Sequence, residues 1–185
     1  NTTSRITKKI VIEPPIFSQQ SHQCIVRHNN MDINELLDDL PMVDIAYLDP
    51  PYNQHPYGSN YFMLNTILNN EITGNISKVS GIPDNWTRSN YNYKHSAYNS
   101  MKHLLMKIKA KYIILSYNDE GIISKKELIQ LFNEIDLFFQ LKEIKYNTYK
   151  GSRNLKNRKK DVTEYLWILS PLYDIIEPYD ITPLI

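Results

Sequence analysis

Short apolar runs alternate with segments whose apolar residues recur at helical spacing along most of the chain. Three of these runs are predicted to be strands, because each is short and rich in β-branched or aromatic residues. They lie at residues 24–28, 43–48 and 111–118. The second run, "VDIAYL", is nearly all apolar, which is typical of a parallel strand that is buried on both faces.

Helices are predicted between these strands. Asp32 is placed as an N-cap, with Glu35 three residues later as its capping-box partner. Further helices are expected at residues 61–68, 96–110 and 124–135, and two more strands at residues 139–149 and 163–170. Residues 70–95, here called the excursion, show little periodicity and are predicted to be a long loop. The alternation predicts an α/β fold with a parallel sheet and helices on both faces, and it leaves an antiparallel edge open.

The composition indicates one soluble domain. The chain has 185 residues, 42% of them hydrophobic, which suits the core of one α/β domain and is short for two. Its formal net charge of +1 argues against a general polyanion binder, so a contact with nucleic acid has to be local. Cys24 is the single cysteine, which excludes an internal disulfide, and no cysteine–histidine cluster has zinc spacing, so no metal is expected. No apolar run approaches the roughly 20 residues of a membrane span, and we expect a cytoplasmic protein of a bacterial cell.

The sequence Asp49-Pro50-Pro51-Tyr52 directly follows the second predicted strand. In an open α/β sheet, ligands bind beyond the carboxyl ends of the strands. An acidic residue next to a buried strand is costly unless it has a partner. A plain turn also accounts for aspartate and proline at such a place. The buried strand before the motif and the aromatic, amide-rich run "YGSNYF" after it favour a binding site.

The chemistry of this motif fits an exocyclic aromatic amine. The lone pair of adenine N6 is delocalised into the ring, so the nitrogen is a poor nucleophile. The Asp49 carboxylate, together with a carbonyl held by the rigid prolines, can accept both amino hydrogens and pull the nitrogen toward a pyramidal form. Tyr52 can stack on the base, which is worth roughly 1–3 kcal/mol. That energy offsets much of the few kcal/mol needed to extrude a base from a duplex.

The motif resembles the catalytic DPPY motif of the amino-methyltransferases that use S-adenosylmethionine. The longer run at residues 43–67 resembles the D12 class of DNA adenine-N6 methyltransferases, many of which belong to type II restriction–modification systems. The likeness continues in "ILSYNDEGII" and in "YKGSRN…EYLWIL", so that three blocks cover residues 24–169. The resemblance implies a Rossmann-like methyltransferase fold with three αβα layers. It also implies methyl transfer to adenine N6 in double-stranded DNA, by base flipping and direct transfer.

The resemblance assigns roles to individual residues. The catalytic positions, which bind the target amine and stack on the base, are Asp49, Pro50, Pro51 and Tyr52. Asp32 resembles the carboxylate that contacts the adenine part of the cofactor, although an N-cap explains it equally well, and Asp49 borders the same pocket. The target base and the cleft beside it are expected to contact Tyr57, Asn60, Tyr61, Ser116, Tyr117 and Asn118.

One part of the family pattern is missing from the sequence. Relatives carry a Phe-x-Gly-x-Gly loop that receives the methionine part of the cofactor, whereas this chain has five glycines and no Gly-x-Gly. In the family's motif order that loop precedes the blocks found here. We therefore expect residues 1–185 to be the carboxyl-terminal portion of one catalytic domain, with a fold and cofactor site that a preceding segment or a second subunit completes.

Two segments are candidates for contact with DNA. Residues 150–160, here called the basic segment, carry six lysines or arginines, which suits a phosphate-contacting loop but also a solvated hairpin loop. These residues are Lys150, Arg153, Lys156, Arg158, Lys159 and Lys160. The excursion is the second candidate, through Trp86, Arg88, Tyr91 and Lys94.

Two other functions stay open on the sequence alone. The same chemistry occurs on RNA, on cytosine N4 and on protein glutamine, although an aspartate at position 49 favours adenine or cytosine over glutamine. The chain can also be a catalytically incomplete, nucleic-acid-binding half-subunit, which the missing glycine loop favours.

Overall fold

A computed structural model describes residues 14, 16, 31–72, 74–147 and 161–170 of the chain. The chain divides into two compact units at residue 30, and the elements described below belong to the second unit, residues 31–185. The strand predicted at residues 24–28 lies outside the described residues, as does the basic segment.

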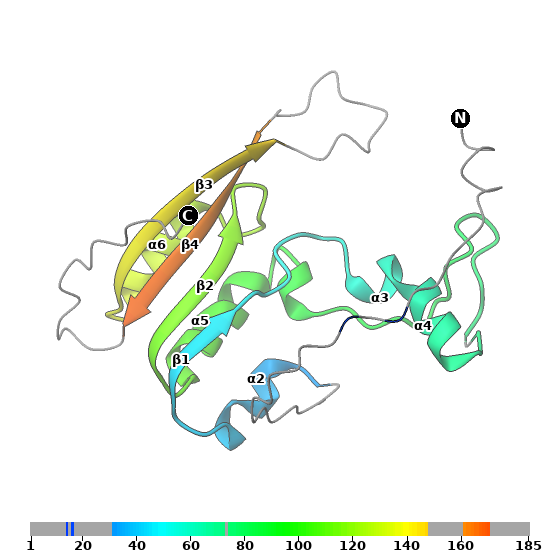
Figure 1. The fold of residues 1–185 in the computed structure, drawn as a ribbon, viewed down its shortest axis with the longest axis horizontal. Coiled ribbons are helices and arrows are strands. Elements are labelled where there is room, and N and C mark those ends of the chain that lie inside the picture. The colour runs from blue at the N-terminus through cyan, green and yellow to red at the C-terminus, as the bar shows by residue number, and fades with distance from the viewer. Residues whose placement is uncertain (1–13, 15, 17–30, 73, 148–160, 171–185) are drawn as a thin grey trace. The chain divides into compact units, whose positions relative to one another are not determined.

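Four strands form one mixed sheet in the order β1-β2-β4-β3 (Figure 1). Their bounds are β1 Val43–Leu48, β2 Ala110–Asn118, β3 Phe138–Asn147 and β4 Asp161–Ser170. β1 and β2 are parallel, whereas β4 runs antiparallel to both β2 and β3. The four predicted strands that fall on described residues are thus confirmed to within two residues, whereas the one at residues 24–28 is not tested. The sheet is less parallel than expected, because β4 enters between β2 and β3 rather than extending the sheet in chain order.

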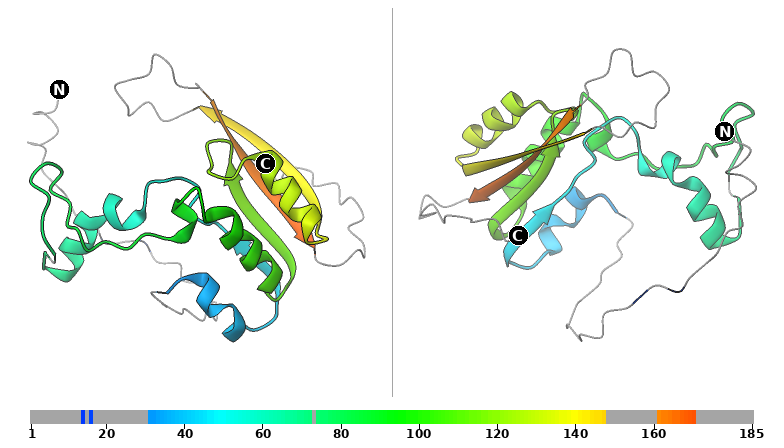
Figure 2. Two further views of the ribbon diagram at one scale, coloured as in Figure 1. Left: turned by 180° about the vertical axis from the view of Figure 1, so that it is seen from behind. Right: turned by 45° about the horizontal axis from the view of Figure 1, so that its top comes forward.

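The described helices are mostly short. Their bounds are α2 Ile33–Leu36, η1 Leu37–Asp39, α3 Tyr57–Asn60, α4 Phe62–Asn69, η2 Asn90–Asn92, α5 Ala97–Lys107 and α6 Lys125–Glu134. α6 begins with a full capping box between Ser124 and Glu127, which satisfies backbone donors at its first turn. α5 and α6 lie on the same face of the sheet, as the front and back views agree (Figures 1 and 2).

The core lies between that face and these two helices. Trp167 of β4 has no exposed surface and packs edge-on against Phe132 of α6, with ring centroids 5.2 Å apart. Ile113 and Leu115 of β2 are buried on the same side, since they pair with Leu169 and Trp167 in the sheet register. Burial of such large apolar side chains contributes roughly 1.5–3 kcal/mol each.

The prediction that β1 is buried on both faces is wrong. Only Ala46 of this strand is buried, whereas Ile45 and Tyr47, on the other face, are 59% and 62% exposed. Among the described strands β1 lies at one end of the sheet, and the described residues place no helix over the face that carries Ile45 and Tyr47. An apolar run shows that a strand can be buried, but it does not show which neighbours are present to bury it.

Candidate active site

The Asp49–Tyr52 motif lies where the sequence predicts it, directly after β1 and beside the carboxyl end of the parallel strand β2. Asp49 is exposed and makes no hydrogen bond to another described residue. Pro50, Pro51 and Tyr52 are half-buried. The chain therefore presents a solvent-accessible carboxylate next to two rigid residues and an aromatic ring.

The backbone of Tyr52 is bound by two residues, one at the end of β2 and one in the loop that joins β2 to α6. Its carbonyl accepts a hydrogen bond from the Ile122 N–H at 2.7 Å and one from the Tyr117 hydroxyl at 3.5 Å. The two tyrosine rings meet edge-on, with centroids 6.3 Å apart. Tyr117 was predicted to line the cleft, but only 2% of it is exposed, so the structure places it behind Tyr52.

Tyr57 and Tyr61, at the two ends of the helical turn α3 that follows the motif, form a stacked pair. Their ring centroids are 5.5 Å apart at an interplanar angle of 20°, and both rings are at least half exposed. Desolvation of the hydroxyl, and next the negative charge of Asp49, raise the pKa of Tyr57 above its ordinary value. Asn60 is exposed on the same helical turn. The exposed ring of Tyr57 thus lies within electrostatic range of the carboxylate, and Tyr61 stacks on it.

The carboxyl end of β2 is polar and closely bonded. Ser116 donates from Oγ to Glu164 Oε1 at 2.9 Å, and the Tyr146 hydroxyl donates to Glu164 Oε2 at 3.4 Å. Asn118 is 4% exposed, and its Oδ1 accepts the Glu120 N–H at 3.1 Å. Ser116 and Asn118 are therefore already engaged within the protein.

Sequence reasoning missed Glu164 and Tyr146. Desolvation, and next the charge of Glu164, raise the pKa of Tyr146, and Tyr52 is near enough to add to this effect. Glu164 lies beside the carboxyl end of β2 because β4 pairs with β2 in an antiparallel register, and Tyr146 lies near Glu164 because β3 pairs antiparallel with β4. The sequence offers no local signal for that register.

Asp32 is confirmed as the N-cap of α2, because its Oδ1 accepts the Asn34 N–H at 3.0 Å. The predicted capping box is not what forms here: the N–H of Glu35 donates to the backbone carbonyl of Asp32 instead. The Asp32 side chain is half-buried. One of its two carboxylate oxygens thus serves the helix, and the other has no partner among the residues described.

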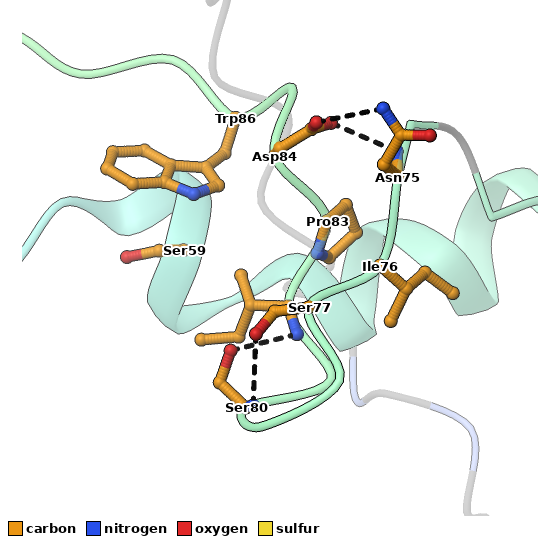
Figure 3. Close-up of a pocket in the computed structure, with 9 residues that line it drawn as sticks. Ser59, Asn75, Ile76, Ser77, Ser80, Pro83, Asp84 and Trp86 are labelled. Atoms are coloured by element: carbon orange, nitrogen blue, oxygen red, sulfur yellow. Dashed lines mark hydrogen bonds between the residues drawn. The ribbon is translucent and has the colours of Figure 1, made fainter.

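The excursion is more ordered than a plain loop. Ile76 and Pro83 form an antiparallel bridge, and Asp84 accepts two hydrogen bonds from Asn75, at 3.0 and 3.1 Å (Figure 3). The turn between them contains Gly81 at φ +71°, a conformation that L side chains rarely adopt. Beside the bridge is an open pocket of about 520 Å³, with Trp86 in its wall.

The four residues of the excursion that were predicted to contact DNA differ in their exposure to solvent. Lys94 is exposed and Trp86 is half-buried in the wall of the pocket. Tyr91 is only 3% exposed, so the structure places it inside the protein rather than on a DNA-facing surface. Arg88 is half-buried and turns toward the loop that follows Tyr52.

The basic segment, with its six predicted DNA contacts, lies outside the described residues. Among the residues that the structure describes, no group of three or more histidine, cysteine, aspartate or glutamate side chains is arranged to hold a metal ion. None of the described helices is long and apolar enough to cross a membrane.

The described residues form an α/β protein in which the Asp49 carboxylate and several aromatic rings lie near the carboxyl ends of two parallel strands, the edge at which open α/β sheets bind ligands. The chain belongs to the family of D12 class N6 adenine-specific DNA methyltransferases, which matches residues 9–131. That match confirms the family to which the sequence was predicted to belong.

Named relatives are DNA modification enzymes. The modification methylase StsI of Streptococcus sanguinis is 36% identical over 144 residues, which are 76% of this chain and 21% of that protein. The type II methyltransferase M.CviAII of Paramecium bursaria Chlorella virus 1 is 32% identical over 126 residues, 68% of this chain and 37% of that protein. The type II methyltransferase M.NlaIII of Neisseria lactamica is 30% identical over 178 residues, 94% of this chain and 51% of that protein. The chain thus spans about half or less of the length of these relatives.

Proposed function

We propose that this chain is the catalytic part of an enzyme that methylates adenine N6 at specific sites in double-stranded DNA, as the modification enzyme of a restriction–modification system. S-adenosylmethionine is the proposed donor. Family membership and the names of the relatives support the reaction class. The observation that carries the proposal is Asp49: an exposed carboxylate at the end of β1, free of hydrogen bonds to other described residues, beside the Tyr57–Tyr61 pair.

The residues of the motif would bind the amine and raise its reactivity. Asp49 and the carbonyl of Pro50 accept the two N6 hydrogens, which draws the nitrogen out of conjugation and directs its lone pair away from the ring plane. Tyr52 stacks on the flipped base, and its own position is fixed by Ile122 and Tyr117. After transfer, N6 is cationic and acidic, so Asp49 or a water molecule can take the surplus proton without a strong base.

The cofactor would be held in part by Asp32. Its second carboxylate oxygen has no partner among the described residues, so it suits a hydroxyl or amine donor of the nucleoside part. When bound, S-adenosylmethionine supplies the electrophilic methyl group. The sequence has no Gly-x-Gly turn to offer backbone N–H groups to the methionine part. We propose that a preceding segment or a second polypeptide supplies them.

The proposed fold is the Rossmann-like, three-layer sandwich of S-adenosylmethionine-dependent methyltransferases. The described mixed sheet with α5 and α6 accounts for two of the three layers. Ile45 and Tyr47 are exposed on the opposite face, where a second helical layer would bury them.

The function is tested by substituting Asp49 in the complete gene product. Wild-type protein should form N6-methyladenine in duplex DNA, measured by mass spectrometry of the digested product. Asp49→Asn keeps the size of the side chain but replaces one acceptor with a donor, and we expect methylation to fall by at least about 10²-fold while DNA binding is kept. Asp44→Asn, on the same strand and paired with Lys111 at 2.6 Å, is the matched control.

Two results would contradict the proposal. If Asp49→Asn keeps wild-type turnover, the Asp49 carboxylate does not have the proposed role. Methylated cytosine, or methylated RNA in place of DNA, would move the enzyme to a related substrate.

A non-catalytic, DNA-binding half-subunit is the second candidate, and the absence of a Gly-x-Gly turn favours it. It predicts DNA binding by the complete gene product with no methylated product under any donor concentration.

A further inference from the structure

The backbone that follows the motif is held by two side chains of the excursion. Asn92 donates from Nδ2 to the carbonyl of Asn53 at 2.7 Å, across 39 residues of sequence. Arg88 donates from Nη2 to the carbonyl of Gln54 at 3.1 Å, across 34 residues. Two adjacent carbonyls, directly after Tyr52, are therefore bound by side chains that are distant in sequence and close to each other.

Arg88 is held in a fixed plane. Its Nη2 also donates to the carbonyl of Asn92 at 3.1 Å, and its guanidinium lies 4.2 Å from the centroid of the Tyr93 ring. It forms no salt bridge with an acidic residue in the described part of the chain. Two carbonyls, both bound by Nη2, and one aromatic face thus set the position of the guanidinium, rather than a carboxylate. These contacts need the reach of the arginine side chain and its flat guanidinium plane.

The segment that carries these side chains is itself anchored in the protein. Asn92 is 2% exposed and its N–H donates to the carbonyl of Ser89 at 3.0 Å. The buried Tyr91 donates from its hydroxyl to the carbonyl of Ser100 in α5 at 3.1 Å, and accepts from Asn34 Nδ2 in α2 at 3.3 Å. The loop after the motif is therefore tied, through this turn, to two helices of the core.

We propose that Arg88 and Asn92 are positioning residues for the target-base side of the active site, an inference that rests on the proposed methyltransferase function. They fix the Asn53–His55 backbone, which continues directly from Tyr52 and leads into the helix of Tyr57. If this loop moves, the distance between the Tyr52 ring and the Tyr57–Tyr61 pair changes. A displacement of about 1 Å at a reacting group can cost about 10²-fold in rate, so the effect falls on turnover rather than on DNA binding.

A phosphate contact by Arg88 is the rival reading, and the two make opposite predictions. A phosphate contact depends mainly on charge, so Arg88→Lys would keep most activity, whereas Arg88→Gln would raise the KM for DNA and flatten its salt dependence. A positioning role depends on the reach of Nη2 and on the guanidinium plane. Lysine keeps the charge, but its nitrogen lies one bond short of the Nη2 position and it has no flat group to lie on Tyr93.

The experiment uses the complete gene product with the variants Arg88→Lys, Arg88→Gln and Asn92→Asp, the last of which removes the donor at nearly constant size. We expect each to lower kcat by about 10- to 100-fold, with the KM for DNA and its salt dependence within about threefold of wild type. Hydrogen–deuterium exchange at the amide of His55, which donates to Asn53 Oδ1 at 2.9 Å, should become faster in all three. That readout does not depend on methylation.

Two controls separate positioning from general instability. Leu128→Ala truncates a fully buried side chain of α6 and should lower the melting temperature without changing the kcat of the folded enzyme. Lys126→Gln removes one exposed positive charge of the same helix and should change neither quantity.

The proposal is overturned if Arg88→Lys keeps wild-type kcat, or if the variants change KM and salt dependence alone. It is also overturned if exchange at His55 is unchanged in folded variants. Failure of the proposed function looks different: the wild-type enzyme itself would yield no N6-methyladenine, while the exchange data would still report whether the two side chains hold the loop.

Discussion

Replacing Tyr117 with phenylalanine tests the support beneath the motif. The Tyr117 hydroxyl accepts a hydrogen bond from the buried Ile123 N–H at 3.2 Å and donates to the Tyr52 carbonyl at 3.5 Å. The ring is 2% exposed, so phenylalanine fills the same space and removes only the oxygen. The variant separates the hydroxyl's contribution from that of ring packing.

The expected loss comes mainly from the Ile123 donor. The Tyr52 carbonyl keeps the shorter bond from Ile122, whereas the Ile123 N–H is left buried without a partner. An unsatisfied buried donor costs about 1–3 kcal/mol. For a chain of this size, that corresponds to a fall in melting temperature of about 2–4 °C for each kcal/mol.

The assay is urea unfolding of the chain, with the midpoint and the slope m measured together. Tyr117→Phe should lower the midpoint and leave m unchanged. Tyr47→Phe is the matched control, because Tyr47 is 62% exposed on β1 and should shift stability by no more than about 0.5 kcal/mol. A Tyr117→Phe midpoint equal to that of the control would refute the reasoning.

Tyr117→Phe also changes how the free energy of unfolding depends on pH above pH 10. Burial raises the pKa of Tyr117 above its ordinary value of 10.0. The contribution of Tyr117 to the free energy of unfolding is therefore fully present below pH 10. It is lost as the pH rises through the pKa of the folded state, because the tyrosine of the unfolded chain releases its proton at a lower pH. The phenylalanine variant lacks this group, so it should lose less stability than wild type between pH 10 and the folded-state pKa.

Three further predictions concern the proposed reaction. Tyr52→Phe and Tyr52→Trp should keep substantial methylation activity and Tyr52→Ala should lose most of it, since stacking needs the ring; a phenylalanine variant as inactive as alanine would point to the hydroxyl. Neutralising Arg153, Arg158 and Lys159 should weaken DNA binding for all sequences and flatten its salt slope by up to about one unit per lost contact, and an unchanged slope would leave the basic segment a solvated loop. Residues 1–185 alone should bind S-adenosylmethionine about 10²-fold or more weakly than a complete relative, because the methionine carboxylate and amine each lack the backbone partner of a charge-assisted bond of about 1.5–3 kcal/mol; tight, stoichiometric binding in calorimetry would contradict this.

The sequence predicts the elements of this fold better than their arrangement. Apolar runs with clear boundaries locate β1 and β2 to within one residue, and the Asp49 motif was correctly expected at the end of β1. The order β1-β2-β4-β3 has no comparable signal, because strand pairing depends on contacts between distant segments. Ile45 and Tyr47 are exposed because the described residues place no helix over their face of the sheet, which an apolar run does not reveal either.

The same limit applies within the site. Residues 49–52 could be recognised because they are adjacent in sequence, and their neighbours Tyr57 and Tyr61 follow within a few positions. Glu164 could not, because it reaches the cleft only through the antiparallel pairing of β4 with β2. Tyr117 was expected to line the cleft but is only 2% exposed, since a strand end does not reveal which of its side chains face the core.

The motif therefore depends on residues that its own sequence does not contain. Its carboxylate and ring are consecutive in the chain, but the backbone that presents them is held by Ile122 from the loop after β2 and by Arg88 and Asn92 from the excursion. Each support is a hydrogen bond to a different carbonyl among three in succession. A rigid site needs such constraints from independent directions, because one anchor still allows the loop to pivot. A bound base would then meet walls that are already in place, so little of its binding energy has to be used in ordering the loop.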